Sequence, residues 1–231
     1  MSNCVKFPEH GTAAQQVFAE METARANDVD WRRGRLGLYV HYAGDDVLEV
    51  AKEGYVQFFS ENALGPKAFP SLRKFEDEVV EWALDLLNAP AGATGVVTSG
   101  GTESLFLALA TARDWARASR PGIQRAEIVI PYSAHPAFDK AAHYLDLAVR
   151  RIPLRNDFRA DVDAMAAAVT PSTILIAGSA PAFPQGVFDP IADIATLARR
   201  RNLWCHVDAC VGGFVAPFVR RIGYPVPDFD F

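Results

Sequence analysis

From about residue 91 onward, short apolar runs alternate with stretches of helical spacing, and this alternation limits the choice of fold more than any other feature of the chain. The apolar runs, which predict strands, lie at 95–98, 127–131, 148–154, 173–179 and 203–208. The stretches that predict helices lie at 102–118, 136–146, 161–169 and 189–201. Such alternation is typical of an α/β fold, in which helices cover a mainly parallel sheet. The run TILIAGS at 173–179 is apolar throughout, so we expect it to be buried on both faces.

The first ninety residues show helical spacing without strands. We expect helices at 12–27, at 45–60 and from Ser71, which is a good N-cap residue, with a loop at 62–70. Asp189 is likewise expected to cap the helix at 189–201, with Pro190 at its first position. The domain organisation that we predict is an N-terminal helical segment, 1–90, followed by an α/β domain, 91–231.

Composition narrows the class of protein. Of the 231 residues, 50% are hydrophobic and 22% are charged, which is the balance of a globular chain and excludes a disordered one. The formal net charge is −5, so the basic character of a nucleic-acid-binding protein is missing. No apolar run approaches the ~20 residues of a membrane span, and the first residues lack the apolar core of a signal peptide. Three cysteines are too few for a disulfide framework. We therefore expect a cytoplasmic protein that acts on small molecules.

A glycine turn, TSGGTES at 98–104, stands between a predicted strand and a predicted helix. Gly100 and Gly101 let the backbone come close to a ligand. The free N–H groups at the start of a helix, with the hydroxyls of Ser99 and Thr102, suit a phosphate group. The alternative is a tight turn in which Thr102 caps the helix. The pattern is not a P-loop, because no Gly-Lys-Ser/Thr follows.

Further candidates follow two of the predicted strands. His206 and Asp208 end the strand at 203–208, and ligands of open α/β sheets bind beyond the carboxyl ends of the strands. There, an aspartate serves as a metal ligand, as a catalytic acid or base, as the partner of a cationic ligand group, or only as a cap for the next turn. A metal pair of His206 and Asp208 has no third ligand nearby in the sequence. His135 follows the strand at 127–131, and Cys210 lies at the same rim as Asp208, where a packing role competes with that of a catalytic thiol.

The order of these motifs resembles that of pyridoxal-phosphate-dependent enzymes of fold type I, in the decarboxylase group, and within that group the sphingosine-1-phosphate lyases. The matching segments cover most of the chain from about residue 36: NALGPKAFPSLRKFEDEVV (62–80), GVVTSGGTESLFLALATARD (95–114), PYSAHPAFDKAAHYLDL (131–147), GSAPAFPQGVFDPIADIA (178–195) and HVDACVGGFVAPF (206–218). The segment at 178–195 is what separates the lyase branch from the amino-acid decarboxylases. The resemblance implies the large domain of the fold type I enzymes, with pyridoxal 5'-phosphate as the cofactor.

The resemblance also implies roles for individual residues. The cofactor phosphate would be held by the turn at Ser99, Gly100, Gly101 and Thr102. Five residues would surround the pyridine ring. His135 would stack on one face, and Ala209 and Cys210 would line the other side. Asp208 would pair with the protonated ring nitrogen, and His206 would lie close to the phenolic oxygen or the lysine. His135 and Asp208 are thus the implied catalytic residues. Asn62 and Tyr42 would contact the substrate, Tyr42 from the neighbouring subunit of a homodimer.

The activity that the resemblance implies is cleavage of a carbon–carbon bond next to an amine, which splits a phosphorylated long-chain base into a fatty aldehyde and phosphoethanolamine. An amino-acid decarboxylase is the alternative, and a non-catalytic remnant is a third interpretation. The family's Schiff-base lysine lies in a Thr-His-Lys segment beyond the Asp208 strand, whereas all five lysines of this chain precede Asp208. We therefore expect a chain truncated before that lysine and before the small domain, inactive alone, in which the apolar residues from Phe214 to Phe231 lack a partner.

Overall fold

The computed structural model describes residues 7–34 and 40–230 and divides into two compact units, Met1–Ser60 and Glu61–Phe231. The first unit contains the helices α1 (Ala14–Ala24) and α2 (Asp45–Gln57), close to the predicted ranges, with short 3-10 helices at Arg25–Asn27 and Trp31–Arg33. No described residue of α1 or α2 is buried. The domain boundary that we predicted at residue 90 falls inside the second unit.

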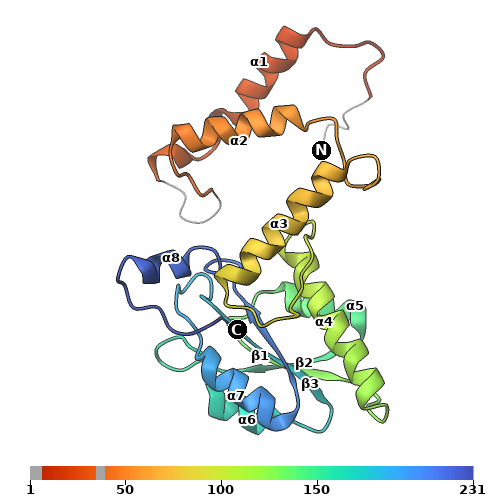
Figure 1. The fold of residues 1–231 in the computed structure, drawn as a ribbon, viewed down its shortest axis with the longest axis vertical. Coiled ribbons are helices and arrows are strands. Elements are labelled where there is room, and N and C mark those ends of the chain that lie inside the picture. Colours follow the sequence, from red (N-terminus) through yellow and green to blue (C-terminus); the bar gives the residue numbers. More distant parts are fainter. Residues whose placement is uncertain (1–6, 35–39, 231) are drawn as a thin grey trace, which may run out of the picture. The chain divides into compact units, whose positions relative to one another are not determined.

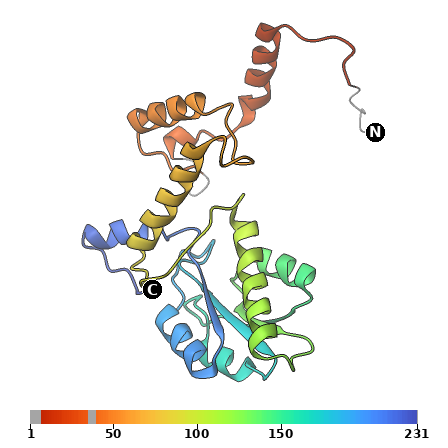
Figure 2. The same ribbon diagram turned by 45° about the vertical axis from the view of Figure 1, so that its right-hand side comes forward.

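A four-stranded parallel sheet forms the centre of the second unit (Figure 1). Its strands are β1 (Glu127–Pro131), β2 (Ala148–Ile152), β3 (Thr173–Ser179) and β4 (Trp204–Asp208), in the order β2-β1-β3-β4. The helices α4 (Gly101–Ser119) and α5 (Ala137–Leu145) cover one face, while α6 (Val162–Ala168) and α7 (Ile191–Arg201) cover the other (Figure 2). The α/β fold class with a parallel sheet is therefore confirmed.

Two hydrophobic clusters, one on each face, hold the sheet between its helices. Successive residues of β1 belong alternately to the two clusters. Ile128 and Ile130 pack with α4 and α5, whereas Val129 packs with α6 and α7. Side chains of a strand point to opposite faces in turn, so a strand covered on both sides is apolar at every position. β3 fits this rule, because all seven of its residues are buried, as the sequence predicts.

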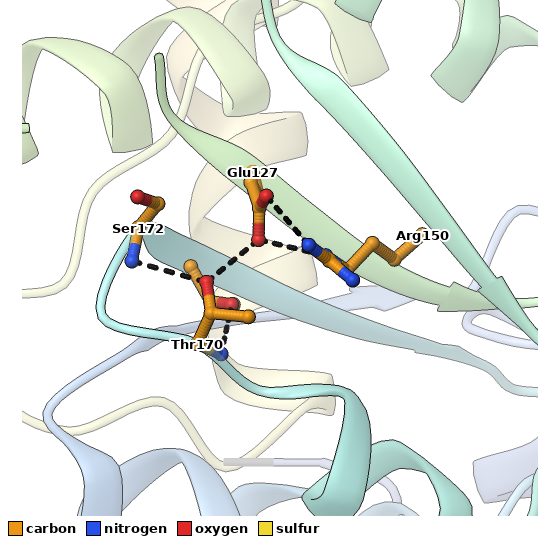
Figure 3. A network of polar contacts seen from close by, with 5 residues as sticks. Glu127, Arg150, Thr170 and Ser172 are labelled. Carbon is orange, nitrogen blue, oxygen red and sulfur yellow. Dashed lines mark hydrogen bonds and ion pairs between the residues drawn. The ribbon is translucent and has the colours of Figure 1, made fainter. Parts of the chain in front are cut away.

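At the amino ends of the strands, a polar network ties β1, β2 and the loop before β3 together (Figure 3). The Glu127 carboxylate accepts hydrogen bonds from Arg150 Nε at 2.8 Å and Arg150 Nη2 at 2.9 Å, and from Thr170 Oγ1 at 2.7 Å. Thr170 Oγ1 in turn accepts from the backbone N–H of Ser172 at 3.1 Å. The network fixes the strand ends opposite to the edge where ligands are expected.

Several local predictions are wrong, each for a physical reason. No strand forms at 95–98, because no described strand lies alongside it, and Val96 and Val97 are exposed. The helix α3 (Pro70–Leu86) begins with Pro70 as its first residue, so Ser71 lies inside the helix and does not cap it. Asp189 does not cap α7, since its carboxylate is used elsewhere.

The last described residues also differ from expectation. A short helix, α8 (Ala216–Arg221), follows the glycines after β4. Phe229 is buried against Phe188, with ring centroids 5.5 Å apart, in the cluster on the α7 face. The prediction that this apolar stretch lacks a partner is therefore wrong for Phe229, although Phe214, Phe218 and Tyr224 are exposed.

Candidate active site

A cavity of about 570 Å³ lies at the carboxyl edge of the sheet. It brings together residues from the glycine turn, from the loop after β1 and from the end of β4. Its lining consists of Thr98, Gly100, Gly101, Thr102, Ser104, Leu105, His135, His206, Val207, Asp208, Ala209 and Cys210. Seven of the eight residues predicted to bind the cofactor thus line one cavity, although they are spread over more than a hundred positions of the sequence.

The glycine turn is held in shape by hydroxyl groups at its two ends. Thr98 Oγ1 lies 2.7 Å from Ser104 Oγ and accepts a hydrogen bond from the Gly100 N–H at 3.3 Å. Gly100 has a φ of 155°, which an L side chain rarely adopts, so glycine is required there by the backbone. Thr98 and Ser104 were not among the predicted site residues, although two hydroxyl residues flanking a glycine pair are a signal that could have indicated their role.

The start of α4 presents free N–H groups to the cavity. No side chain caps this helix, and within residues 7–34 and 40–230 the N–H groups of Gly101 and Thr102 have no acceptor. A Cβ added at Gly101 would meet nothing closer than Cys210 Sγ, at 3.8 Å, which is an ordinary contact. Protein packing therefore does not demand a glycine at 101, whereas a ligand close to the backbone would.

Asp208 is the last residue of β4 and lies opposite Ser179 of β3. Its Oδ1 accepts a hydrogen bond from the Cys210 N–H at 3.1 Å, and its backbone carbonyl accepts one from the Ala180 N–H at 2.8 Å. Oδ2 makes no hydrogen bond to any part of the chain that the structure describes. One carboxylate oxygen is thus fixed by the protein, and the other is free to accept a hydrogen bond or to pair with a cation.

His206 lies one strand residue below Val207 and shares a strand face with Asp208. Its ring makes an edge-to-face contact with Phe138, with centroids 5.7 Å apart. Desolvation lowers the pKa of the His206 imidazole, and the Asp208 carboxylate opposes this only in part. The ring is therefore neutral at pH 7 and brings no charge to the cavity. Among the residues that the structure describes, no group of three His, Cys, Asp or Glu side chains could hold a metal ion.

His135 comes to the cavity from the loop between β1 and α5. Its Nδ1 accepts a hydrogen bond from the Ala137 N–H at 3.1 Å, which leaves Nε2 to carry the proton in the neutral ring. The side chain is exposed, so one face of the imidazole is open to a ligand.

Ser99 is the predicted cofactor residue that does not line this cavity. Its N–H donates to Glu103 Oε2 at 2.6 Å, and it lines a neighbouring hollow with Thr102, Phe106, Lys140 and Tyr144. The hydrogen bonds from Ser99 lower the pKa of Glu103. Ser99 therefore shapes the turn from outside the cavity.

Of the two predicted substrate residues, Asn62 belongs to the unit that carries the cavity but does not line it. Asn62 is exposed, and its Oδ1 accepts from the Leu64 N–H at 3.2 Å. Tyr42 belongs to the unit Met1–Ser60, where its ring lies 5.7 Å from that of Trp31 and where Arg32 pairs with Asp45. Desolvation and the Asp45 carboxylate raise the pKa of the Tyr42 hydroxyl. Contact of either residue with a substrate stays a prediction.

The sequence of this chain is similar to that of known proteins. The model of the pyridoxal-dependent decarboxylase conserved domain matches residues 4–229. The chain is 41% identical to a sphingosine-1-phosphate lyase of Oryza sativa subsp. japonica over 226 residues, covering 94% of this chain and 42% of that protein. It is 38% identical to a probable L-tyrosine/L-aspartate decarboxylase of Methanocella arvoryzae, covering 92% of this chain and 54% of that one.

Among solved structures, the sphingosine-1-phosphate lyase of Burkholderia pseudomallei superimposes with a TM-score of 0.91 and 34% identity, covering 99% of this chain and 54% of that one. The chain thus spans about half or less of the length of the relatives that it matches. No helix within the described residues is long and apolar enough to cross a membrane. The predicted resemblance is confirmed: the chain belongs to the pyridoxal-dependent decarboxylase family, whose cofactor is pyridoxal phosphate.

Proposed function

We propose that the whole protein is a pyridoxal-phosphate-dependent carbon–carbon lyase that splits a phosphorylated long-chain base into a fatty aldehyde and phosphoethanolamine. The observation that carries the proposal is the single cavity in which Asp208, His135 and the glycine turn meet. The identity of 41% to a plant sphingosine-1-phosphate lyase supports the choice of substrate class.

The residues of the cavity fit the cofactor. The uncapped N–H groups of Gly101 and Thr102 suit a phosphate, and the open space at Gly101 lets that phosphate approach the backbone. The unpaired Oδ2 of Asp208 suits a protonated ring nitrogen. When bound, pyridoxal phosphate supplies an aldehyde that reacts with amines and a ring that accepts electrons.

In this proposal, each side chain has one task. The Asp208 carboxylate keeps the proton on the ring nitrogen, which needs a full negative charge at that point. His135 stacks on one face of the ring and Cys210, with Ala209, borders the other. His206, held neutral by desolvation, lies near the phenolic oxygen without adding a second charge. Tyr42 and Asn62 contact the substrate.

The proposal requires a Schiff-base lysine that this stretch of sequence does not contain. The five lysines of the chain all precede Asp208, and no described lysine of the unit Glu61–Phe231 lines the cavity. Lys52 and Lys74 are paired with Glu49 and Glu78 on their own helices. We therefore propose that residues 1–231 bind the cofactor but do not turn over substrate alone.

We also propose that the whole protein is a cytoplasmic homodimer. Support comes from the unit Met1–Ser60, in which Val17, Phe18 and Met21 of α1 are 38%, 64% and 60% exposed. Exposed apolar residues at helical spacing favour burial against another surface. Sedimentation of the whole protein at twice the mass of one chain is the expected result.

An amino-acid decarboxylase is the second candidate, because the Methanocella arvoryzae relative bears that name at 38% identity. The two activities differ in what leaves the carbon next to the amine: an aldehyde, or carbon dioxide. The deciding experiment gives the whole protein sphingosine 1-phosphate or, separately, tyrosine and aspartate. We expect a long-chain aldehyde and phosphoethanolamine from the first and no carbon dioxide from the others. Carbon dioxide release without aldehyde formation would replace the lyase by a decarboxylase.

A further inference from the structure

The loop that carries His135 is held from the neighbouring strand by one arginine. Arg151 of β2 donates from Nη1 to three backbone carbonyls: that of Pro131, the last residue of β1, at 3.0 Å, and those of Tyr132 and Ala134 in the following loop, at 3.2 Å each. Three carbonyls converge on a single nitrogen only if the loop curls around the guanidinium. The path of the backbone immediately before His135 is therefore set by Arg151.

The other terminal nitrogen of the same guanidinium, Nη2, binds a residue of α5. Arg151 Nη2 donates to Asp139 Oδ2 at 2.5 Å, and Asp139 lies in the first turn of that helix. The Arg151 side chain is only 20% exposed, whereas that of Asp139 is 50% exposed, so the arginine lies against the protein and the carboxylate faces water. A planar guanidinium makes such contacts in fixed directions, which a single ammonium group does not.

The orientation of the His135 ring depends on this loop. The ring is exposed, and the hydrogen bond that it makes is the one from the Ala137 N–H to Nδ1. That bond forms only while residues 135 and 137 keep their relative position at the junction of the loop and α5. Arg151 contacts both sides of the junction, at Ala134 and at Asp139.

We propose that Arg151 is a positioning residue for His135: by holding the loop and the start of α5 together, it fixes the direction of the imidazole toward the cavity and keeps the proton on Nε2. An effect of the His135 orientation on cofactor binding rests on the proposed function. The effect of Arg151 on the orientation of the His135 ring does not. This positioning role differs from a general contribution to the stability of the fold. Substitution of the neighbouring Arg150 therefore serves as the control. Arg150 is paired with Glu127 in the network at the opposite ends of the strands.

The test uses the 231-residue chain labelled with ¹⁵N-histidine, in which long-range ¹H–¹⁵N spectra report which ring nitrogen carries the proton. Spectra of His135→Gln assign the signal among the five histidines. We compare Arg151→Gln and Arg151→Lys with Arg150→Gln. The wild type and Arg150→Gln are expected to show the Nε2–H form of His135, even if Arg150→Gln lowers the melting temperature. Arg151→Gln is expected to show a mixture of the two neutral forms, and Arg151→Lys a smaller shift in the same direction.

An unchanged His135 signal in Arg151→Gln would overturn the proposal and leave Arg151 with a structural role only. If Arg151→Gln does not fold, Arg151→Lys decides by the same signal. A second measurement is titration with pyridoxal phosphate, in which we expect about tenfold weaker binding for Arg151→Gln and less than about a twofold change for Arg150→Gln. Failure of the wild-type chain to bind the cofactor would count against the proposed function, while the proton position on His135 would still decide the role of Arg151.

Discussion

Ser179 and Asp208 lie directly opposite one another as the last paired residues of β3 and β4. The Ser179 N–H donates to the buried Asp189 carboxylate at 2.8 Å, and the other oxygen of that carboxylate accepts from the Ala160 N–H at 2.7 Å. A fully buried acid thus fixes the strand end that borders the proposed cofactor carboxylate. Asp189 was expected to cap a helix, and its true partners could be found only in the folded chain.

Asp189→Asn should destabilise the protein, because an amide has one acceptor oxygen for two N–H donors. We expect a loss of about 1–3 kcal/mol in the free energy of unfolding. Desolvation raises the pKa of Asp189 above the usual 3.8, although the two N–H groups oppose this. Folding therefore favours the protonated acid, and this contribution to stability decreases as the pH rises from 3.8 through the folded pKa. As the pH rises from 3.5 to 7, the free energy of unfolding measured in urea should therefore fall for the wild type and for an Asp85→Asn control relative to that of Asp189→Asn.

Asp208→Asn should keep the fold and lose function. The amide oxygen can still accept from the Cys210 N–H, so the local backbone is preserved. Its neutral side chain no longer stabilises a proton on the ring nitrogen. In the whole protein we expect turnover to fall by more than tenfold, about 1.4 kcal/mol in the barrier, with an unchanged far-ultraviolet circular dichroism spectrum. Turnover within about threefold of wild type would contradict the assigned role.

Gly101→Val should weaken cofactor binding without unfolding the protein. The nearest atom to a Cβ at 101 is Cys210 Sγ at 3.8 Å, so the branched side chain points into space that the proposed phosphate needs. Titration of the 231-residue chain with pyridoxal phosphate measures the change. The matched control is Gly122→Val, since no atom lies within 4 Å of its added Cβ and it is not part of the cavity. Equal dissociation constants for both variants would refute the phosphate role of the turn.

Glu127→Gln should reduce stability in a way that depends on pH. The amide loses the ionic hydrogen bonds from Arg150, so the free energy of unfolding decreases, although the exposure of the arginine keeps the loss small. The hydrogen bond from Arg150 is the main reason that the pKa of Glu127 lies below its usual 4.5. This stability is present above pH 4.5 and is lost as the pH falls through the lowered pKa. Wild type and variant should therefore differ most in urea midpoint near pH 7 and converge in acid; a constant difference would show that the charge is not involved.

Treatment of the 231-residue chain with pyridoxal phosphate and borohydride should not label any one lysine preferentially. No described lysine of the unit Glu61–Phe231 lines the cavity, and Lys140 lies in the neighbouring hollow beside Ser99. Peptide mapping of the reduced product measures the labelling, with Lys140→Ala as the comparison. Stoichiometric labelling of Lys140 in the wild type, abolished in that variant, would identify a catalytic amine that we have not assigned.

The sequence predicted the parts of the fold that depend on local pattern. Four strands appear at or within two residues of their expected bounds, and β1 and β3 match them completely, because their apolar runs end at polar residues or turns. The strand predicted at 95–98 does not form, because a strand needs a neighbouring strand to pair with. The residues of a segment do not show whether such a neighbour exists. The cap at Ser71 failed because the adjacent Pro70, with its fixed φ, already starts the helix.

The residues that line the candidate site could be predicted from the sequence, but the residues that hold the surrounding backbone in place could not. Gly100, His135 and Asp208 follow predicted strands or precede a predicted helix, and the sequence pattern alone reveals such positions. Arg151 and Asp189 act through backbone groups that lie 10 to 29 positions away, and an arginine in a strand or an aspartate before a proline gives no hint of this. Such contacts depend on the register between parallel strands, which the pattern of a single strand does not contain.

The strand order also determines when the cavity can exist during synthesis of the chain. β1 and β2 are made first, β3 pairs with the other side of β1, and β4, which is made last, pairs with β3. About 70 residues separate His135 from Asp208, which a ribosome adds in about 4–15 s at ordinary rates of ~5–20 residues per second. Throughout that interval the nascent chain carries the glycine turn and the imidazole without the carboxylate. The site that combines the turn, the imidazole and the carboxylate is therefore complete only after β4 has left the ribosome.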